Sequence, residues 1–532
     1  MMFASLMPKF TPTQQAILKE SFEITQDYSD FLHYYTIPVE ASLLVLGDTQ
    51  EAREFAKLAG EYEGGKYQVG LLSPQEIVAI NGHLGAFEAR ILIEGEPHSV
   101  KFAQMVLFYE DENLLRFMGC ENAGDYADAD ELLGVLDSRL GDYTYRNIIF
   151  YDANKCQYHH RREDKEGNGY CHQCADVCPT FGVGRDDSLM ELKFSALDCI
   201  SCGACVNVCP SGAVQRDGFD KESLYKIAKL YKGITPVVCN ERDITGLQNV
   251  DFGGVESRGL ETGGVESKGA DSSGGDFGAS ATALPLAVAQ VHLLNEVYLL
   301  TLVQESGSQI VVFDPVGDVR LESSARFLNE IFQKIYKKDA VFVASNLEEL
   351  QAAINLACPQ EEFHYTYAQD QKEALRNIFA QRLMFMVRDG EFGKVENRGN
   401  TYGRVFVDEG KCTLCLGCVG ACNVQSLSAG DFALMHNPSL CTACGYCADS
   451  CPEGAISLDF SGLELSGKWF ERQVMAKDAG FRCVECGKVF ANQKAVEKIK
   501  AIMLPIFGDD ALKIRTLECC EACKVKVMFG VS

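Results

Sequence analysis

The chain has 532 residues, enough for three or four domains at roughly 150 residues each. Its 49 Lys and Arg residues against 75 Asp and Glu residues give a formal charge of −26, which argues against a nucleic-acid partner because such partners need cationic contacts. The composition, 47% hydrophobic and 23% charged, is that of a folded protein, and the 24 cysteines are its unusual feature.

No segment predicts a membrane anchor or a secretory signal. The longest largely apolar stretch, 283–294, is too short to span a bilayer and contains Gln290 and His292. The first ten residues lack a long apolar core and a cleavage site of small residues. Clustered cysteines in a reducing compartment usually bind metal rather than pair as disulfides, so we expect a cytoplasmic protein.

The first predicted unit is an α/β domain over residues 1–150. Its apolar periodicity indicates a helix at 49–62 and strands at 41–46, 67–72, 89–93 and 106–109. A mixed sheet with few helices fits this pattern.

Residues 151–220 are predicted to form a first cysteine-rich module. The run Cys199-x2-Cys202-x2-Cys205-x3-Cys209 is followed by proline. This spacing lets a tight loop supply three thiolates to a cubane iron–sulfur cluster, while a second run supplies the fourth. The second run, Cys171-x2-Cys174-x3-Cys178, has Asn168 where its first cysteine would stand.

The spacing therefore predicts two [4Fe–4S] clusters in this module. One is expected on Cys178, Cys199, Cys202 and Cys205, and the other on Cys156, Cys171, Cys174 and Cys209. Cys156 lies fifteen positions before Cys171 and reaches the cluster if the polar residues 157–170 loop out. The alternatives for this ligand are His159, His160 or His172 in place of the thiolate, or a three-iron cluster.

Residues 221–358 alternate between predicted strands and helices, which implies parallel βαβ units. Strands are expected at 235–239, 310–313 and 340–344, and helices at 284–304, 322–336 and 346–354. Residues 245–282 should be a disordered, mobile insertion. This segment is rich in glycine, serine and acidic residues, contains GGVES twice and has too few apolar side chains to bury apolar surface. A helical linker over 359–402, with its helix at 371–386, should follow.

The strongest pattern lies in a second module at 403–460. Two complete runs, Cys412-x2-Cys415-x2-Cys418-x3-Cys422 and Cys441-x2-Cys444-x2-Cys447-x3-Cys451, follow each other. Each run supplies three ligands to one cluster and one to the other, so the predicted [4Fe–4S] sites are Cys412, Cys415, Cys418 and Cys451, and Cys422, Cys441, Cys444 and Cys447. Asn423 stands where proline usually follows such a run. Zinc also binds Cys-x2-Cys pairs, but it does not require this doubled pattern.

Residues 461–532 are predicted to form a small zinc-ribbon-like domain. The two Cys-x2-Cys pairs Cys483/Cys486 and Cys520/Cys523 fit a closed tetrahedral Zn²⁺ site, and a fifth iron–sulfur cluster is the alternative. Such a site would stabilise a domain too thin to fold by its own core. Cys120, Cys239 and Cys358 stand alone and are expected to be buried as small hydrophobic residues.

No pattern predicts a catalytic centre within the chain. No G-x-G-x-x-G follows a predicted strand, so a dinucleotide site has no support. The stretch Gly60-x4-Gly65-Lys66 resembles a phosphate loop, but Tyr67 stands where Ser or Thr should bind magnesium, and a helix precedes the stretch.

Together these elements predict an α/β multidomain protein. Two α+β dicluster ferredoxin modules are interleaved with α/β, parallel-sheet domains, and a small metal domain with four cysteine ligands follows. The segment 401–529 contains the runs KCTLCLGCVGAC, LCTACGYCADSCPEGAI, FRCVECGKVF and CCEACKVKVMF. In these runs the chain resembles bacterial 4Fe–4S ferredoxin-type proteins with two dicluster modules, which often accompany molybdenum- or tungsten-dependent formate dehydrogenases. The stretch 234–354 looks like a degenerate relative of the iron–sulfur (delta) subunit of methyl-viologen-reducing hydrogenase.

The resemblance implies electron transfer between redox partners, with a formate dehydrogenase as one such partner. The first hypothesis is a conduit that passes electrons through four [4Fe–4S] clusters. The second is an accessory or assembly factor for a formate dehydrogenase, with structural or sensing clusters. The third is an oxidoreductase subunit whose active site lies in a partner.

Overall fold

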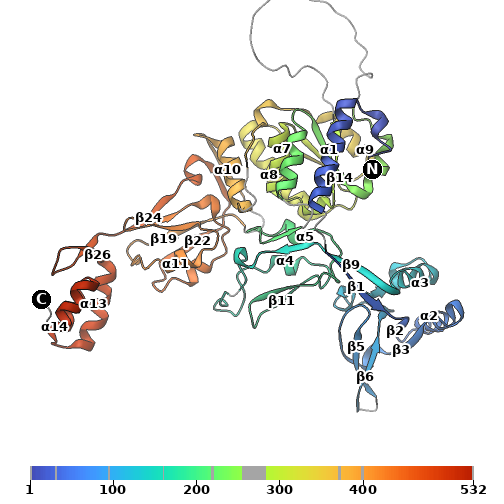
Figure 1. The fold of residues 1–532 in the computed structure, drawn as a ribbon, viewed down its shortest axis with the longest axis horizontal. Helices are drawn as coiled ribbons and strands as arrows, with labels where there is room; N and C mark the ends of the chain where they lie inside the picture. The colour runs from blue at the N-terminus through green and yellow to red at the C-terminus, as the bar shows by residue number, and fades with distance from the viewer. Residues whose placement is uncertain are drawn as a thin grey trace, which may run out of the picture.

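The computed structural model describes residues 3–29, 33–93, 96–159, 161–216, 221–253, 283–368, 373–396 and 401–529. Within these ranges, two α/β domains and two small cysteine-rich modules adjoin one another, and a helical C-terminal domain lies at one end (Figure 1). In this part of the chain, no helix combines the length and the apolar character needed to cross a membrane.

The N-terminal domain consists of two stacked sheets and two helices. The predicted mixed sheet is wrong, because the strands separate into a parallel and an antiparallel sheet. The parallel sheet has the order β3-β2-β7-β8, formed by β2 (Ser42–Leu46), β3 (Gln68–Leu72), β7 (Gln104–Leu107) and β8 (Cys120–Asn122). The antiparallel sheet contains β4 (Ile77–Asn81), β5 (Phe87–Ile93) and β6 (Glu96–Phe102).

Strand β2 shows why these layers stack. Its side chains alternate between two faces, so Leu43 and Val45 pack beneath α2 (Gln50–Glu61) and α3 (Ala129–Asp137). Leu44 and Leu46 contact the antiparallel sheet on the other face. The strand predicted at 41–46 and the helix predicted at 49–62 are thus confirmed to within one residue.

Helix α1 (Pro12–Ser29) packs on the central domain and not on the sheets of the N-terminal domain, although the sequence grouped them in one domain. Its Leu18 is fully buried in the core of the central domain, together with Phe3 and Leu6. The helix contacts α6 (Lys221–Leu230) and β15 (Ala283–Val288) of that domain. Figure 1 shows α1, in blue, among the elements of the central domain. An antiparallel ribbon of β1 (His33–Val39) and β9 (Gly141–Asn147) then leads into and out of the N-terminal domain.

The central domain has a parallel sheet flanked by helices. The sheet order is β15-β14-β16-β17, with β14 (Thr235–Asn240), β16 (Ile310–Phe313) and β17 (Val341–Ala344). The helices that follow the strands are α7 (Glu296–Ser306), α8 (Val319–Tyr336) and α9 (Leu347–Leu356). The predicted βαβ alternation is therefore present.

The single helix predicted at 284–304 is wrong. Its first residues form β15, and helix α7 begins only after Asn295, whose side chain accepts hydrogen bonds from the N–H groups of Val297 and Tyr298. A continuous apolar run lacks the periodicity that separates a buried strand from a buried helix. Pro285 is tolerated in β15 because this strand lies at the edge of the sheet.

The predicted insertion begins too early. Residues Glu241–Asn249 form a 3₁₀ helix, and Val250 and Phe252 are buried in the central core. The carbonyl of Phe252 accepts a hydrogen bond of 3.1 Å from the N–H of Ala283. Residues 254–282, including both GGVES repeats, lie outside the described residues.

The predicted linker is largely part of the central core. Helix α10 (Leu375–Val387) packs on α7, and its Arg382 forms a fully buried ion pair of 2.8 Å with Glu305. Strand β18 (Glu391–Val395) pairs with β23 (Leu463–Ser466) beyond the second module. Residues 369–372 and 397–400 lie outside the described residues, so the predicted helix start at 371 is among them.

The two cysteine-rich modules share one topology. Each has a first and a last strand that pair antiparallel, an inner hairpin and two short helices that contact each other. The first module contains β10 (Ile149–Tyr151), α4 (Gln173–Asp176), β11 (Val183–Asp186), β12 (Glu191–Phe194), α5 (Ala204–Asn207) and β13 (Val214–Arg216). The second contains β19 (Arg404–Val407), α11 (Gly417–Ala421), β20 (Leu427–Gly430), β21 (Ala433–His436), α12 (Tyr446–Asp449) and β22 (Ile456–Asp459).

The C-terminal domain starts later than the sequence indicated. Strand β24 (Gln473–Lys477) still pairs with β21 of the second module, so the separate domain covers residues 480–529. It contains β25 (Gly480–Arg482), β26 (Val489–Asn492), α13 (Gln493–Phe507), α14 (Ala511–Thr516) and α15 (Glu521–Phe529).

Candidate iron–sulfur and metal sites

The module topology identifies the counterpart of Cys156 in the second module. The residues Asp152-x2-Lys155-Cys156 follow β10, and Asp408-x2-Lys411-Cys412 follow β19. In both turns the aspartate N–H donates a 2.8 Å hydrogen bond to the residue before the last strand of the module, which is Ala213 or Ala455. Cys156 therefore occupies the place of Cys412. The repeated D-x2-K-C motif is visible in the sequence and marks Cys156 as the equivalent of Cys412. The prediction of the ligand sets used only the spacing of the cysteines and not this motif.

Burial and mutual proximity shape the cysteine groups. In the second module, burial raises the pKa of Cys418 to about 11, and thiolates at Cys412, Cys415 and Cys451 add to this. In the first module, burial raises the pKa of Cys205, and thiolates at Cys199, Cys202 and Cys178 add to it. A thiol with a raised pKa gives up its proton when a cation takes its place, which is the condition that a metal cluster supplies.

Within each of the four predicted ligand sets, the buried thiols lie close enough for their thiolates to raise one another's pKa. We name the four sets by their position relative to the contact between the modules. The first outer site is Cys178, Cys199, Cys202 and Cys205, and the first inner site is Cys156, Cys171, Cys174 and Cys209. The second inner site is Cys422, Cys441, Cys444 and Cys447, and the second outer site is Cys412, Cys415, Cys418 and Cys451.

The second outer site shows how four cysteines of a predicted set face one common space. All four of its cysteines line one small cavity, which Leu414, Leu434 and Ile456 close with apolar side chains. Cys451 comes from the other cysteine run, as the crossed assignment requires. Cys415 is exposed, whereas Cys412 and Cys418 are buried.

Backbone geometry around the sulfur atoms also fits a bound cluster. The N–H groups of Tyr158 and Ala443 point at the sulfur atoms of Cys156 and Cys441, at 3.4 and 3.3 Å. Ser201, Leu414 and Ala443, each directly before a cysteine, have φ values of 62°, 51° and 53°. This left-handed conformation is unfavourable for residues other than glycine, so the surrounding structure holds these loops in it.

The first outer site lies between two domains. On one side, the N–H of Met118 in the N-terminal domain donates to Asp198, and Arg116 donates to the carbonyl of Thr180. On the other side, the central domain contacts α5, where Asn207 donates to the carbonyl of Leu294 at 3.0 Å. Gly203 has a φ of 82° and lies so close to Leu293 that a Cβ would meet it at 2.9 Å.

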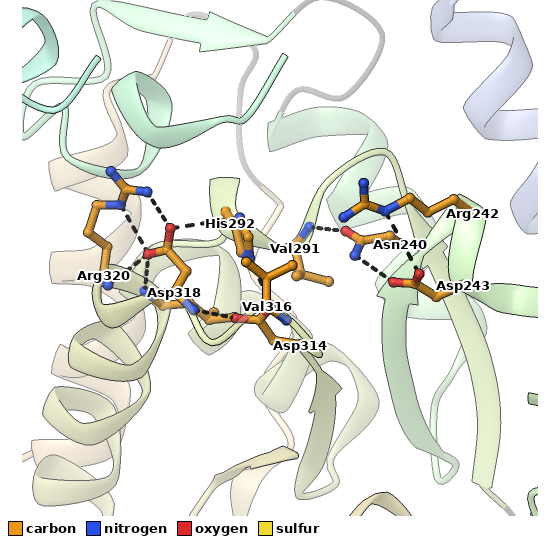
Figure 2. A network of polar contacts seen from close by, with 10 residues as sticks. Asn240, Arg242, Asp243, Val291, His292, Asp314, Val316, Asp318 and Arg320 are labelled. Atoms are coloured by element: carbon orange, nitrogen blue, oxygen red, sulfur yellow. Dashed lines mark hydrogen bonds and ion pairs between the residues drawn. The ribbon is translucent and has the colours of Figure 1, made fainter. Parts of the chain in front are cut away.

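A buried polar network in the central domain lies beside its contact with α5. No feature of the sequence predicted this network. Figure 2 shows His292 between Asp314 and Asp318, in the loops that follow β15 and β16. His292 Nε2 lies 2.8 Å from Asp314, whose carboxylate also accepts the N–H of Asp318 at 2.7 Å. Although burial opposes ionisation, these hydrogen bonds lower the pKa of Asp314.

Arg320 connects the network to the cysteines. Its hydrogen bond to Asp318 raises its pKa, and the nearby Cys202 and Cys205 thiolates add to this. The carboxyl edge of a parallel sheet commonly holds ligands, but here it supports a cysteine loop.

The histidine alternatives differ in their placement. Nδ1 of His172 is 2.5 Å from the carboxylate of Asp176, and the ring of His159 lies edge-on to Tyr151. His160 lies outside the described residues.

Cys120 and Cys239 are buried, and Cys358 is half-buried. Lys66 of the phosphate-loop-like stretch pairs with Asp137 at 2.8 Å and follows helix α2, as the sequence indicated.

In the C-terminal domain, the predicted metal ligands converge. The sulfur atoms of Cys483, Cys486, Cys520 and Cys523 all lie within 4.8 Å of one another. Although burial opposes it, hydrogen bonds from the backbone N–H groups of Cys520, Cys486 and Glu485 lower the pKa of Cys483 to about 6. An all-sulfur set of four at this separation fits a single metal ion in tetrahedral coordination.

Two comparisons with protein families agree with these modules. Residues 168–214 match the family model described as 4Fe–4S dicluster domain, and residues 434–457 match the one described as 4Fe–4S binding domain. The chain therefore contains two ferredoxin-type, cluster-binding domains in a mixed α/β framework with parallel sheets. Domains of this class exchange single electrons with redox partners.

Proposed function

We propose that this protein is an electron carrier that holds four [4Fe–4S] clusters in series. The first and second modules each supply eight cysteines, which form the four sites named above. The observation that carries the proposal is the arrangement of these sixteen cysteines in two modules of one topology that contact each other directly. Redox centres in neighbouring sites serve electron transfer, and their potentials depend on burial, charge and hydrogen bonds to sulfur.

The chain's own residues define the ends of the series. The exposed Cys415 makes the second outer site the accessible end for a redox partner. The first outer site is covered by the N-terminal and central domains, which act as docking and spacing elements. The four-cysteine site in the C-terminal domain holds one Zn²⁺, which is redox-silent and stabilises the fold of that domain.

The resemblance described above makes a formate dehydrogenase in the cytoplasm the first partner to test. An electron carrier passes electrons to such an enzyme when it is reduced, or receives electrons from the enzyme when it is oxidised. An assembly factor leaves the activity of the mature enzyme unchanged, and its deletion yields an enzyme that lacks cofactor.

The cluster content is tested by anaerobic purification with iron, sulfide and zinc analysis. We expect about sixteen iron atoms and about one zinc per chain, from four cubanes and one closed thiolate site. Low-temperature paramagnetic resonance during stepwise reduction should show all clusters taking up electrons. A colourless protein that contains only zinc would contradict the proposal.

The Cys156→Ser variant tests the least regular ligand. Because Cys156 takes the place of Cys412, we expect the first inner site to lose its cluster or retain a three-iron form, with the other three clusters intact. Cys358→Ser is the matched control, because Cys358 lies outside the four groups, and its iron content should equal that of the wild type.

A further inference from the structure

The chain departs from the ferredoxin motif at two places, and both lie where the modules meet. The first is the segment 157–170, which we call the strap. Cys156 and Cys171 are fifteen positions apart, whereas the equivalent Cys412 and Cys415 are three apart, so the strap is an insertion into one cysteine run. The second departure is Asn423, which stands where proline usually follows Cys422.

The strap contacts the second module near both of its ends. Gln157 donates to the hydroxyl of Thr442, and Arg161 donates to the carbonyl of Ala421. Arg162 donates to the carbonyl of Asp449 at 3.0 Å. These three contacts involve the residues beside Cys441, Cys422 and the end of helix α12.

Aromatic rings also take part in the contact between the strap and the second module. The hydroxyl of Tyr170 donates to the carboxylate of Asp449 at 2.9 Å, and its ring centroid lies 4.9 Å from that of Tyr446. The guanidinium of Arg161 lies 4.3 Å from the Tyr446 centroid. Tyr446 stands between Cys444 and Cys447, so the strap covers the loop that holds these two cysteines.

Asn423 reaches in the opposite direction. Its side-chain amide donates to the carbonyls of Lys155 and Cys156, at 2.9 and 3.0 Å. Proline has no side-chain donor and cannot form these bonds. A ligand of the first inner site is thus held by the residue next to Cys422, a ligand of the second inner site.

These contacts place the two inner sites next to each other. Asn423, the residue after Cys422, holds the carbonyl of Cys156, and Tyr170, the residue before Cys171, packs against Tyr446. Arg161 donates to the carbonyl of Ala421, directly before Cys422, and its guanidinium lies over the Tyr446 ring. The positive charge of Arg161 therefore faces the second inner site, although Arg161 belongs to the first module.

We infer that the strap and Asn423 form a junction through which single electrons pass between the two inner sites, and that Arg161 stabilises the reduced form of the second inner cluster. The inference rests on the proposed function. One electron leaves the cluster of one inner site, which is oxidised, and enters that of the other, which is reduced, and no bond or proton changes. A positive charge favours the reduced form because reduction adds negative charge.

The Arg161→Gln variant tests the electrostatic part in the anaerobic full-length protein. Potentiometric titration followed by paramagnetic resonance should show the second inner cluster shifted toward the oxidised form. We expect about a tenfold change in the oxidised-to-reduced ratio, which is about 59 mV for one electron. Arg472→Gln is the matched control, because Arg472 is an exposed arginine beside the second module that donates to Ser428.

The Asn423→Ala and Asn423→Pro variants test the contact itself. In the fully reduced wild type, spin–spin interaction between the inner clusters should broaden the resonance signals, and both variants should weaken it at unchanged iron content. Asn154→Ala, at an exposed position of the first module, should leave it unchanged.

The outcomes separate the junction from the proposed function. If all four clusters are reducible but Arg161→Gln shifts no potential more than Arg472→Gln, or both Asn423 variants retain the full broadening, the junction is refuted and the electron carrier stands. If the wild type holds no reducible clusters, both fail.

Discussion

At the scale of single residues, the neutral side chain of His436 connects two segments of the second module by hydrogen bonds. It is 1% exposed, and its Nε2 accepts the N–H of Val405 at 3.1 Å. Its Nδ1 lies 2.9 Å from the hydroxyl of Ser426, which itself donates to the carbonyl of Asn437. Nδ1 therefore carries the proton. Burial, together with the charge of Arg404, lowers the pKa of His436 to about 4.

We predict that the second module loses stability as the pH falls from about 6.5 towards 4. The unfolded chain binds a proton near pH 6.5 and the folded one only near 4, so the unfolded state gains protons in between. The free energy of unfolding should fall by up to about 1.4 kcal/mol per pH unit. Denaturant unfolding followed by cluster absorbance from pH 7 to 5 measures this. In His436→Gln, whose amide oxygen still accepts from Val405, the dependence should flatten. An unchanged slope would rule out His436 as its source.

At the scale of elements, the C-terminal domain depends on its four cysteines. Its buried cluster within the described residues consists of Cys483, Cys519 and Cys520, with Phe490, Cys523 and Val527 packed against it, and Val496 of α13 is buried besides. The helices α13 to α15 expose most of their apolar residues, such as Ile506 and Phe529. So small a core does not stabilise a domain, whereas a structural thiolate site contributes on the order of 10 kcal/mol.

We predict that Cys520→Ser unfolds residues 480–529 and leaves the two cluster modules folded. Limited proteolysis should cut within this domain, zinc should be lost, and visible cluster absorption should stay at the wild-type level. Cys519→Ser is the control, because Cys519 lies outside the group of four and a serine hydroxyl retains its hydrogen bond to the carbonyl of Arg515. If Cys520→Ser resists the protease as well as the wild type does, the domain does not need the metal.

At the scale of the whole molecule, the central domain connects segments that are distant in the sequence. Helix α1, the parallel sheet and α10 share one apolar core, although they lie on both sides of the first module in the chain. The strands β14 and β15 pair in parallel across residues 254–282, and the Phe252–Ala283 hydrogen bond brings the ends of that segment together. The fold therefore does not require this segment to span a distance.

We predict that replacing residues 254–282 with three glycines leaves iron content and fold unchanged. The unfolding temperature should stay equal or rise slightly, because a shorter loop costs less entropy to close. Calorimetry with elemental analysis measures both, and a scrambled segment of the original length is the control. A large loss of stability or of clusters in the glycine variant alone would show that the segment has a structural role.

Local patterns in the sequence predicted much of the fold. Strand β2 and helix α2 followed from hydrophobic periodicity, because each buries one face against a neighbour. The cysteine sets followed from spacing, because a cubane requires thiolates at short intervals. Strand β15 was mistaken for a helix because a segment buried on both faces carries no periodicity.

By itself, the sequence determined the spacing of the cysteines and hence the predicted ligand sets, since ligand spacing is a local property of the chain. Tertiary structure alone decided what the irregularities are for. In the sequence, the strap and Asn423 are only departures from a cysteine motif. Their contacts form when the second module packs against the first, because their partners lie more than 250 positions away. Contacts between segments so distant depend on how whole domains pack, and no local pattern of residues encodes that packing.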